Sequence, residues 1–268
     1  MKPIAVAVNG ILGKMGREVV SAVCQQQDMI LVGGADIKAT QNTIDLPFSR
    51  GHAPIFKDIA ALLDATKSDV LVDFSAADAA LNAIRVAAER KTNVVIGTTG
   101  FSADSLKQIE TISKDNGIGI VIADNFALGA VLMMHLAKIA SMYFDYAEII
   151  EAHNYEKADA PSGTALATVR GMIQAKGKPF VSPQTKTFTL QNVRGGQVDG
   201  VTIHSVRLPG LVANQEVIFA GQGQTLSIKH DTINRECFMP GVMLAIREVV
   251  EHHEFVYGLE KLLHLGGT

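Results

Sequence analysis

The sequence predicts an α/β protein with an N-terminal doubly wound parallel sheet and a C-terminal α+β domain with an open mixed sheet. Short apolar runs rich in β-branched residues alternate with helical stretches over the first half of the chain, as in parallel sheets buried on both faces. A glycine-rich turn joins the first run to the first helix. From about residue 125 the pattern changes to a long apolar helix followed by alternating segments.

The first half contains five apolar runs that we expect to form strands, over residues 4–8, 29–35, 69–74, 93–96 and 118–123. Helices are expected between them, over residues 14–27, 77–90 and 103–114. The first helix carries Met15, Val19 and Val23 on one face, which is the spacing of an amphipathic helix. Because parallel strands are joined by right-handed crossovers, the helices should cover both faces in a Rossmann-type arrangement.

The second half is expected to hold helices over residues 129–143, 162–175 and 238–250. Strands are expected over residues 147–152, 185–190, 201–207, 215–220 and 225–230, where alternating segments are separated by Gly-rich turns. We therefore predict a dinucleotide-binding domain made of residues 1–126 and 235–268. Residues 127–234 are predicted to form a substrate-binding and oligomerisation domain.

The composition argues against several classes of protein. The 268 residues carry 24 Lys and Arg against 27 Asp and Glu, and this net charge of −3 disfavours a general nucleic-acid binder. Hydrophobic residues make up 47% and charged residues 19%, a globular composition. Cys24 and Cys237 have no disulfide or zinc spacing, so a reducing cytoplasm is expected. No apolar run suits a membrane helix, and residues 1–10 are expected to hold a buried strand rather than a signal peptide.

Residues 9–16, with the sequence NGILGKMG, follow the first strand and open the first helix. Gly10 permits a tight turn, Gly13 lets the backbone approach a diphosphate, and Gly16 lets the helix pack closely on the strand. A diphosphate would lie at the helix N-terminus, where unpaired N–H groups and the helix dipole favour anions. The alternative is a Gly-rich turn with no ligand. The expected cofactor-binding residues here are Gly10, Ile11, Leu12, Gly13, Lys14 and Met15.

Asp36 and Lys38 bear on the choice of cofactor. Asp36 ends the second apolar run about 20 residues after Gly16, where a ribose-binding carboxylate is expected. A carboxylate accepts hydrogen bonds from the ribose hydroxyls and repels a 2′-phosphate, whereas Lys38 would attract that phosphate. The sequence favours NADH as the cofactor and does not exclude NADPH.

The sequence EAHNYEKADAPSGT, residues 151–164, holds the richest set of reactive side chains. His153 is expected at the end of a strand and Lys157 in the loop beyond it, and both can carry a proton. Pro161 is expected to begin a helix whose N-terminus offers free N–H groups and a hydroxyl to a carboxylate. Those groups belong to Ser162, Gly163 and Thr164. The alternative is a capped helix with a surface histidine.

This stretch resembles the signature of the bacterial dihydrodipicolinate reductase (4-hydroxy-tetrahydrodipicolinate reductase) family, E-x-H-H-x-x-K-x-D-A-P-S-G-T. Other motifs agree, in the same order along essentially the whole chain: GILGKMG, Asp73-Phe74-Ser75, Gly97-Thr98-Thr99-Gly100, Asn125-Phe126, HSVRLPG and GQTLSIKHD. The resemblance implies an NADH- or NADPH-dependent reductase of the diaminopimelate–lysine pathway, acting on a cyclic dicarboxylate with a conjugated imine. It also implies a homotetramer formed through the sheet of the second domain.

The resemblance also assigns roles to individual residues. His153 matches the catalytic histidine of the family, and Lys157 matches its proton donor. A dianionic substrate also needs positive partners: Lys157 serves there too, and Arg235 is a further candidate on charge alone, with a surface arginine as the alternative. The substrate-carboxylate site is matched by Gly163 and Thr164. The loop beside the nicotinamide and the segment that lines the cofactor are matched by Gly97, Thr98, Thr99, Ala123, Asp124, Asn125 and Phe126.

Two positions depart from the family pattern. Asn154 replaces a second histidine that helps to bind substrate, and asparagine can form hydrogen bonds but cannot be cationic. Ala127 stands where serine is usual. We expect an active reductase with altered substrate contacts. Two other interpretations stay open: a dehydrogenase acting on an amino-acid-like substrate such as aspartate, and a non-catalytic nicotinamide-nucleotide sensor.

No metal site is expected. His252 and His253 are flanked by Glu251 and Glu254, but adjacent residues of a helix point in different directions. We interpret this group as a solvated helix face.

Overall fold

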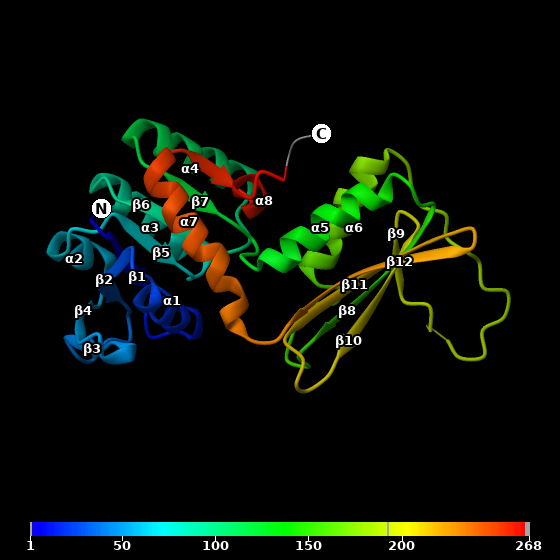
Figure 1. Ribbon diagram of the computed structural model, residues 1–268, viewed down its shortest axis with the longest axis horizontal. Helices are drawn as coiled ribbons and strands as arrows, with labels where there is room; N and C mark the ends of the chain where they lie inside the picture. Colours follow the sequence, from blue (N-terminus) through cyan, green and yellow to red (C-terminus); the bar gives the residue numbers. More distant parts are fainter. Residues whose placement is uncertain (1, 192, 266–268) are drawn as a thin grey trace. The chain divides into compact units, whose positions relative to one another are not determined.

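The computed structural model describes residues 2–191 and 193–265, and the chain divides into two compact units. Unit 1 comprises residues 1–128 and 235–268, and unit 2 comprises residues 129–234. Unit 2 is therefore inserted between two segments of unit 1 (Figure 1). The predicted α/β fold, with a parallel sheet followed by a mixed sheet, is confirmed. Within the described residues, no helix is long and apolar enough to cross a membrane.

Among the described residues, the sheet of unit 1 has eight strands in the order β13-β7-β6-β5-β1-β2-β4-β3. Their bounds are β1 (Ile4–Asn9), β2 (Met29–Ala35), β3 (Thr43–Asp45), β4 (His52–Phe56), β5 (Val70–Asp73), β6 (Asn93–Ile96), β7 (Ile120–Ile122) and β13 (Phe255–Tyr257). β3 pairs antiparallel with β4 at one edge, and the other neighbours pair in parallel. The central strands are continuous apolar runs because both of their faces are buried.

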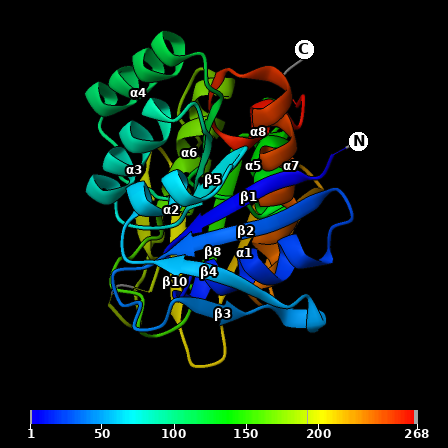
Figure 2. The same ribbon diagram turned by 90° about the vertical axis from the view of Figure 1, so that its left-hand side faces the viewer.

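Helices cover both faces of this sheet (Figure 2). One face is covered by α1 (Lys14–Gln25) and α7 (Met239–His252), and the other by α2 (Ile59–Ala65), α3 (Ala77–Glu89) and α4 (Ala103–Asn116). The remaining short helices of unit 1 are η1 (Pro47–Ser49), η2 (Arg235–Phe238) and α8 (Leu259–Leu262). The core beneath α2, α3 and α4 includes Leu62, Ile84, Ile96 and Ile109, all fully buried.

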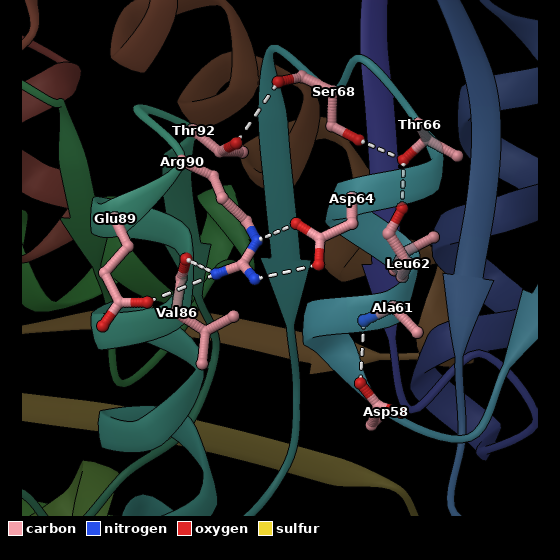
Figure 3. Close-up of polar contacts among 10 residues, drawn as sticks. All are labelled: Asp58, Ala61, Leu62, Asp64, Thr66, Ser68, Val86, Glu89, Arg90 and Thr92. Atoms are coloured by element: carbon pink, nitrogen blue, oxygen red, sulfur yellow. Dashed lines mark hydrogen bonds and ion pairs between the residues drawn. The ribbon is translucent and has the colours of Figure 1, made fainter.

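Polar side chains fix the ends of α2 and α3 (Figure 3). Asp58 caps the N-terminus of α2 by accepting a hydrogen bond from the amide of Ala61 at 2.8 Å. Arg90, at the end of α3, binds the carboxylate of Asp64 with Nε at 2.7 Å and Nη2 at 3.1 Å. This two-point contact joins the two helices in a defined orientation.

Among the described residues, unit 2 has a five-stranded sheet in the order β12-β11-β8-β10-β9. Its strands are β8 (Tyr146–His153), β9 (Gly196–Val198), β10 (Val201–Arg207), β11 (Ala213–Gly221) and β12 (Gln224–Thr232). β10 runs parallel to β8, and the other pairs are antiparallel, so the sheet is mixed. α5 (Leu128–Ser141) and α6 (Gly163–Lys176) lie side by side over one face and bury Ile149, Val169 and Phe219 (Figure 1).

The prediction of a strand over residues 185–190 is wrong. These residues form bends and irregular backbone with exposed side chains, including Phe188 and Leu190, and β9 pairs with β10 instead. A strand needs a partner for its backbone groups, and alternation alone does not supply one. The sequence analysis also named no element over residues 43–65, where β3, β4 and α2 lie.

Candidate active site

The carboxyl ends of β1 and β5 meet where the strand order of unit 1 reverses. Asn9 and Asp73 end these strands, and Nδ2 of Asn9 donates to Oδ2 of Asp73 at 2.8 Å. Asp73 is fully buried, and its other oxygen accepts from the amide of Ser75 at 2.6 Å. Doubly wound sheets bind their ligands beside such a reversal, so this edge is the place to look for a cofactor.

The glycine loop between β1 and α1 is held against the end of β2. The amides of Gly10 and Ile11 both donate to the carbonyl oxygen of Ala35, at 2.8 and 3.2 Å. Gly10 has a φ of +70°, a conformation that favours glycine. The side chain of Ile11 is buried, and a Cβ on Gly34 would lie 2.3 Å from its Cδ1. Ile11 can therefore contact a ligand only through its backbone.

The amides that remain for an anion are at the start of α1. Lys14 and Met15 are its first residues, and N–H groups there have no acceptor within the helix. The N-cap, Gly13, has no side chain to accept from them, and no acidic residue lies in the first turn. A Cβ on Gly16 would lie 2.2 Å from the carbonyl oxygen of Gly10, so loop and helix approach more closely than a side chain allows. This cradle fits the diphosphate of a dinucleotide.

Asp36 lies beside this cradle. Its Oδ2 accepts from the amide of Leu12 at 3.1 Å, and its Oδ1 accepts from the amide of Lys38 at 2.9 Å. The carboxylate thus joins the end of β2 to the glycine loop. The side chain of Lys38 is exposed. The structure therefore brings the predicted ribose-binding carboxylate to the loop, with a cation two residues away.

The predicted nicotinamide loop follows β6. The amide of Gly97 donates to the carbonyl of Asp73 at 2.9 Å, and a Cβ on Gly97 would overlap the ring of Phe74. Thr98 is buried, and its hydroxyl donates to the carbonyl of Ser75 at 2.5 Å, whereas Thr99 is exposed. Thr98 therefore fixes the loop, and Thr99 is available to a ligand.

The segment after β7 lies at the same edge of the sheet. Asn125 accepts from the amide of Ala127 at 2.8 Å, and Phe126 is buried with its ring 5.8 Å from that of Phe74. Asp124 accepts from the hydroxyl of Tyr257 at 2.7 Å. Burial and this carboxylate together raise the pKa of Tyr257 to about 12. The predicted cofactor-binding segments of unit 1, including Ala123, therefore follow the carboxyl ends of adjacent strands.

His153 ends β8 in unit 2, and its ring is held by Glu151. Nδ1 of His153 lies 2.5 Å from Oε2 of Glu151, whose side chain is fully buried. Arg207 on β10 binds both carboxylate oxygens of Glu151, at 2.9 and 2.8 Å. Burial lowers the pKa of His153 and outweighs the opposing effect of Glu151. Glu151 and Arg207 stand in the motifs EAHNYEKADAPSGT and HSVRLPG, but no role was predicted for either of them.

Lys157 lies in a tight turn just beyond His153. Its amide donates to the carbonyl of Asn154 at 3.1 Å, and its Nζ lies 2.7 Å from Oδ1 of Asp159. The side-chain oxygen of Asn154 accepts from the amide of Glu156 at 3.0 Å. The oxygen of Asn154 thus holds the turn, which leaves its NH₂ group to serve a ligand.

Ser162 caps α6, because its hydroxyl accepts from the amide of Ala165 at 3.2 Å. The amide of Ser162 donates to Oε1 of Glu151 at 3.3 Å. The prediction that Pro161 begins the helix is wrong, because the helix begins at Gly163. The hydroxyl and amide of Ser162 contact the protein itself. The N–H groups left for an anion at this helix end are those of Gly163 and Thr164, and a Cβ on Gly163 would meet open space.

Two other predicted features belong to unit 1. Arg235 is the first residue of η2. His252 pairs with Glu248 at 3.3 Å, whereas Nδ1 of His253 lies 3.0 Å from Oδ1 of Asn93. The described residues contain no group of three or more His, Cys, Asp or Glu that could hold a metal ion.

Comparison with known proteins identifies the family. The sequence models described as "Dihydrodipicolinate reductase, N-terminus" and "Dihydrodipicolinate reductase, C-terminus" match residues 4–126 and 129–263. The chain belongs to the dihydrodipicolinate reductase family. The family resemblance found in the sequence is thereby confirmed.

Relatives of this family match along nearly the whole chain. A 4-hydroxy-tetrahydrodipicolinate reductase of Dehalococcoides mccartyi is 51% identical over 265 residues, which cover 99% of this chain and 100% of the relative. One from Moorella thermoacetica is 44% identical and covers 97% of this chain and 98% of its own. The dipicolinate-bound dihydrodipicolinate reductase of Paenisporosarcina sp. TG-14 superposes with a TM-score of 0.86 at 39% identity, covering 97% and 99% of the two chains.

Proposed function

We propose that this chain catalyses the NADH- or NADPH-dependent reduction of 4-hydroxy-tetrahydrodipicolinate to tetrahydrodipicolinate in lysine and diaminopimelate biosynthesis. Its family and the names of its full-length relatives support this function. The observation that carries the proposal is the cluster of His153, Lys157 and the free amides at the start of α6. A nucleotide sensor would need none of these groups, and an aspartate-type dehydrogenase is not favoured by the relatives.

In this proposal unit 1 is the dinucleotide-binding domain. The first amides of α1 hold the diphosphate, and Asp36 accepts hydrogen bonds from the ribose. When bound, the nicotinamide cofactor supplies a hydride. The residues proposed to bind it are Gly10, Ile11, Leu12, Gly13, Lys14, Met15, Asp36, Lys38, Gly97, Thr98, Thr99, Ala123, Asp124, Asn125 and Phe126.

Unit 2 is proposed to bind the cyclic dicarboxylate substrate. A carboxylate would accept hydrogen bonds from the amides of Gly163 and Thr164, where the dipole of α6 favours negative charge. The NH₂ group of Asn154 is a further donor. Because this residue is neutral, it attracts the dianion less than a protonated histidine would.

Lys157 is the proposed proton donor. Loss of the 4-hydroxyl of the substrate as water leaves a conjugated imine. Hydride addition to that imine places electron density on the ring, and the product needs a proton there. The ammonium of Lys157 can provide that proton, and the Asp159 carboxylate 2.7 Å away orients it. His153 lies on the adjacent strand end with its ring fixed by Glu151, so it can hold the substrate by a hydrogen bond to its other nitrogen.

We also infer a cytoplasmic homotetramer. The sheet of unit 2 has one face covered by α5 and α6, and side chains of β8 that point the other way, such as Ile150, are partly exposed. Two cysteines that form no disulfide agree with a reducing compartment. Light scattering at micromolar concentration tests the oligomer, and a monomer would contradict this inference.

The function is tested by following nicotinamide absorbance with freshly generated 4-hydroxy-tetrahydrodipicolinate, with NADH and NADPH in parallel. We expect rapid oxidation by the wild type and a loss of about 10²–10⁴-fold in kcat for Lys157→Ala. Lys178→Ala is the matched control, because Lys178 also pairs with an aspartate but is largely exposed. Wild-type turnover by Lys157→Ala would remove the proposed donor, and no oxidation by a folded wild type would overturn the function.

A further inference from the structure

We propose that Glu151, clamped by Arg207, is a positioning residue that selects the Nδ1–H tautomer of His153 and anchors the start of α6. This inference rests on the proposed function, because it concerns how the same site is held. Neither residue was singled out by its chemistry in the sequence. The structure assigns their role through the contacts of one buried carboxylate.

Glu151 is fully buried, and both of its carboxylate oxygens form hydrogen bonds. Oε2 meets Nδ1 of His153 at 2.5 Å and Nη1 of Arg207 at 2.9 Å. Oε1 accepts from Nη2 of Arg207 at 2.8 Å and from the amide of Ser162 at 3.3 Å. These groups meet because Glu151 and His153 are two residues apart on β8, and Arg207 is the neighbour of His153 in the parallel pairing with β10.

The charges around the ring indicate which tautomer is present. Burial raises the pKa of Glu151, but hydrogen bonds from Arg207, Ser205 and His153 outweigh it, so the carboxylate stays ionised. Arg207 already balances that charge, and a protonated His153 would add a second cation beside it and near Lys157. Neutral His153 must then donate from Nδ1 to the carboxylate, because an ionised carboxylate only accepts. Its Nε2 is therefore an acceptor.

The other charged groups of the cluster are held by the same clamp. Nη2 of Arg207 also donates to the carbonyl of Asp159 at 2.7 Å, and the Asp159 carboxylate holds Lys157. From β11, the neighbour of Glu151 in the sheet is the uncharged Gln215. One guanidinium thus joins the strand of His153 to the loop of the proposed proton donor. With His153 an acceptor, Lys157 is left as the proton source.

The same strand offers a matched control on its opposite face. Oε2 of Glu148 lies 2.8 Å from Nε2 of His204, and its other oxygen pairs with Arg194. Glu148 therefore also joins a histidine and an arginine, but three residues earlier on β8 and away from α6. Glu148→Gln removes a carboxylate of the same kind without touching the proposed site.

The experiment combines ring-nitrogen NMR of ¹⁵N-histidine-labelled protein with pH profiles of kcat and KM for the wild type, Glu151→Gln and Glu148→Gln. His153 is assigned by the loss of its signals in His153→Asn. In the wild type at neutral pH we expect a protonated Nδ1 and an unprotonated Nε2. For Glu151→Gln we expect a mixture of tautomers, a fall in kcat of about 10–100-fold and an acid limb moved to lower pH. Glu148→Gln should match the wild type in all three, with its oligomeric state checked by light scattering because Glu148 lies on the same sheet face as Ile150.

The outcomes separate this inference from the proposed function. A wild-type His153 protonated on Nε2 overturns the inference, and this result needs no variant to fold. A folded Glu151→Gln with the wild-type tautomer and pH profile also overturns it, even while Lys157→Ala remains inactive. If the wild type oxidises neither cofactor, the function fails, and the tautomer of His153 still decides the inference. Arg207→Lys provides a second variant. A mixture of His153 tautomers and a reduced kcat in this variant would support the role of Arg207 in holding Glu151.

Discussion

Replacing Gly16 by alanine should weaken the folding of unit 1 and its binding of the cofactor together. The new Cβ would lie 2.2 Å from the carbonyl oxygen of Gly10 and 2.8 Å from Cα of Ile11, and neither backbone atom can rotate away. Overpacking of this kind costs about 1–3 kcal/mol, and alanine in a helix recovers about 1 kcal/mol. Because the collision is with backbone, we expect a net loss of about 2 kcal/mol, or a fall in Tm of about 4–8 °C.

Thermal unfolding and NADH binding by fluorescence measure the two effects. Gly171→Ala in α6 is the control, because its Cβ would meet only the flexible methylenes of Lys138, at 3.2 and 3.3 Å. That variant should keep or slightly raise Tm, since alanine favours the helix. We expect Gly16→Ala to bind NADH at least about tenfold more weakly, a change of about 1.4 kcal/mol. Wild-type Tm and NADH affinity in Gly16→Ala would refute the argument that this close approach builds the cradle.

Three further predictions concern capping, pH and cofactor choice. Ser162→Ala should lower stability by about 1 kcal/mol, seen as a Tm about 2–4 °C lower, because the amide of Ala165 loses its cap; an unchanged Tm would contradict the capping role. The pKa of Glu151 is lowered in the folded chain, so the ionised carboxylate stabilises the fold above the unfolded pKa, and this stabilisation is lost as the pH falls through the folded pKa. The urea midpoint of the wild type should therefore exceed that of Glu151→Gln at pH 7, and the two midpoints should become equal in acid. Asp36→Asn should raise the NADPH-to-NADH ratio of kcat/KM by about tenfold, because the 2′-phosphate is no longer repelled while Lys38 remains; an unchanged ratio would place the ribose elsewhere.

The interior strands of unit 1 could be predicted because burial on both faces makes them continuous apolar runs. The strands at the edges, and β4 next to one edge, could not. β3 has three residues, two of them exposed, and β4 contains Pro54, which weakens a strand signal. β13 has only three half-buried residues. At an edge, pairing with a neighbour decides the structure, and the local pattern does not contain that neighbour.

The candidate site shows the same division between local and distant information. His153 and Lys157 stand out in one short motif, and the structure places them on a strand end and the following turn. Glu151 begins the same motif, but its positioning role could not be predicted, because a charged residue in an alternating strand is expected to face solvent. Its burial depends on Arg207, which lies 56 residues away and reaches it through the β8–β10 register. From the sequence, the Ser162 hydroxyl could either cap α6 or bind a substrate carboxylate. Only the structure shows that it caps the helix.

The insertion of unit 2 within unit 1 has a consequence for folding during synthesis. β7 lies beside β13 in the finished sheet of unit 1, and α7 covers one face of that sheet. About 130 residues separate β7 from β13 along the chain. At about 5–20 residues per second, the ribosome needs about 7–26 s to cover that distance. During this time β7 is an unpaired edge and an apolar sheet face stays uncovered, while the whole of unit 2 is synthesised. The unit that begins first is therefore completed last, and its exposed β7 edge is the place where a chaperone would be most useful.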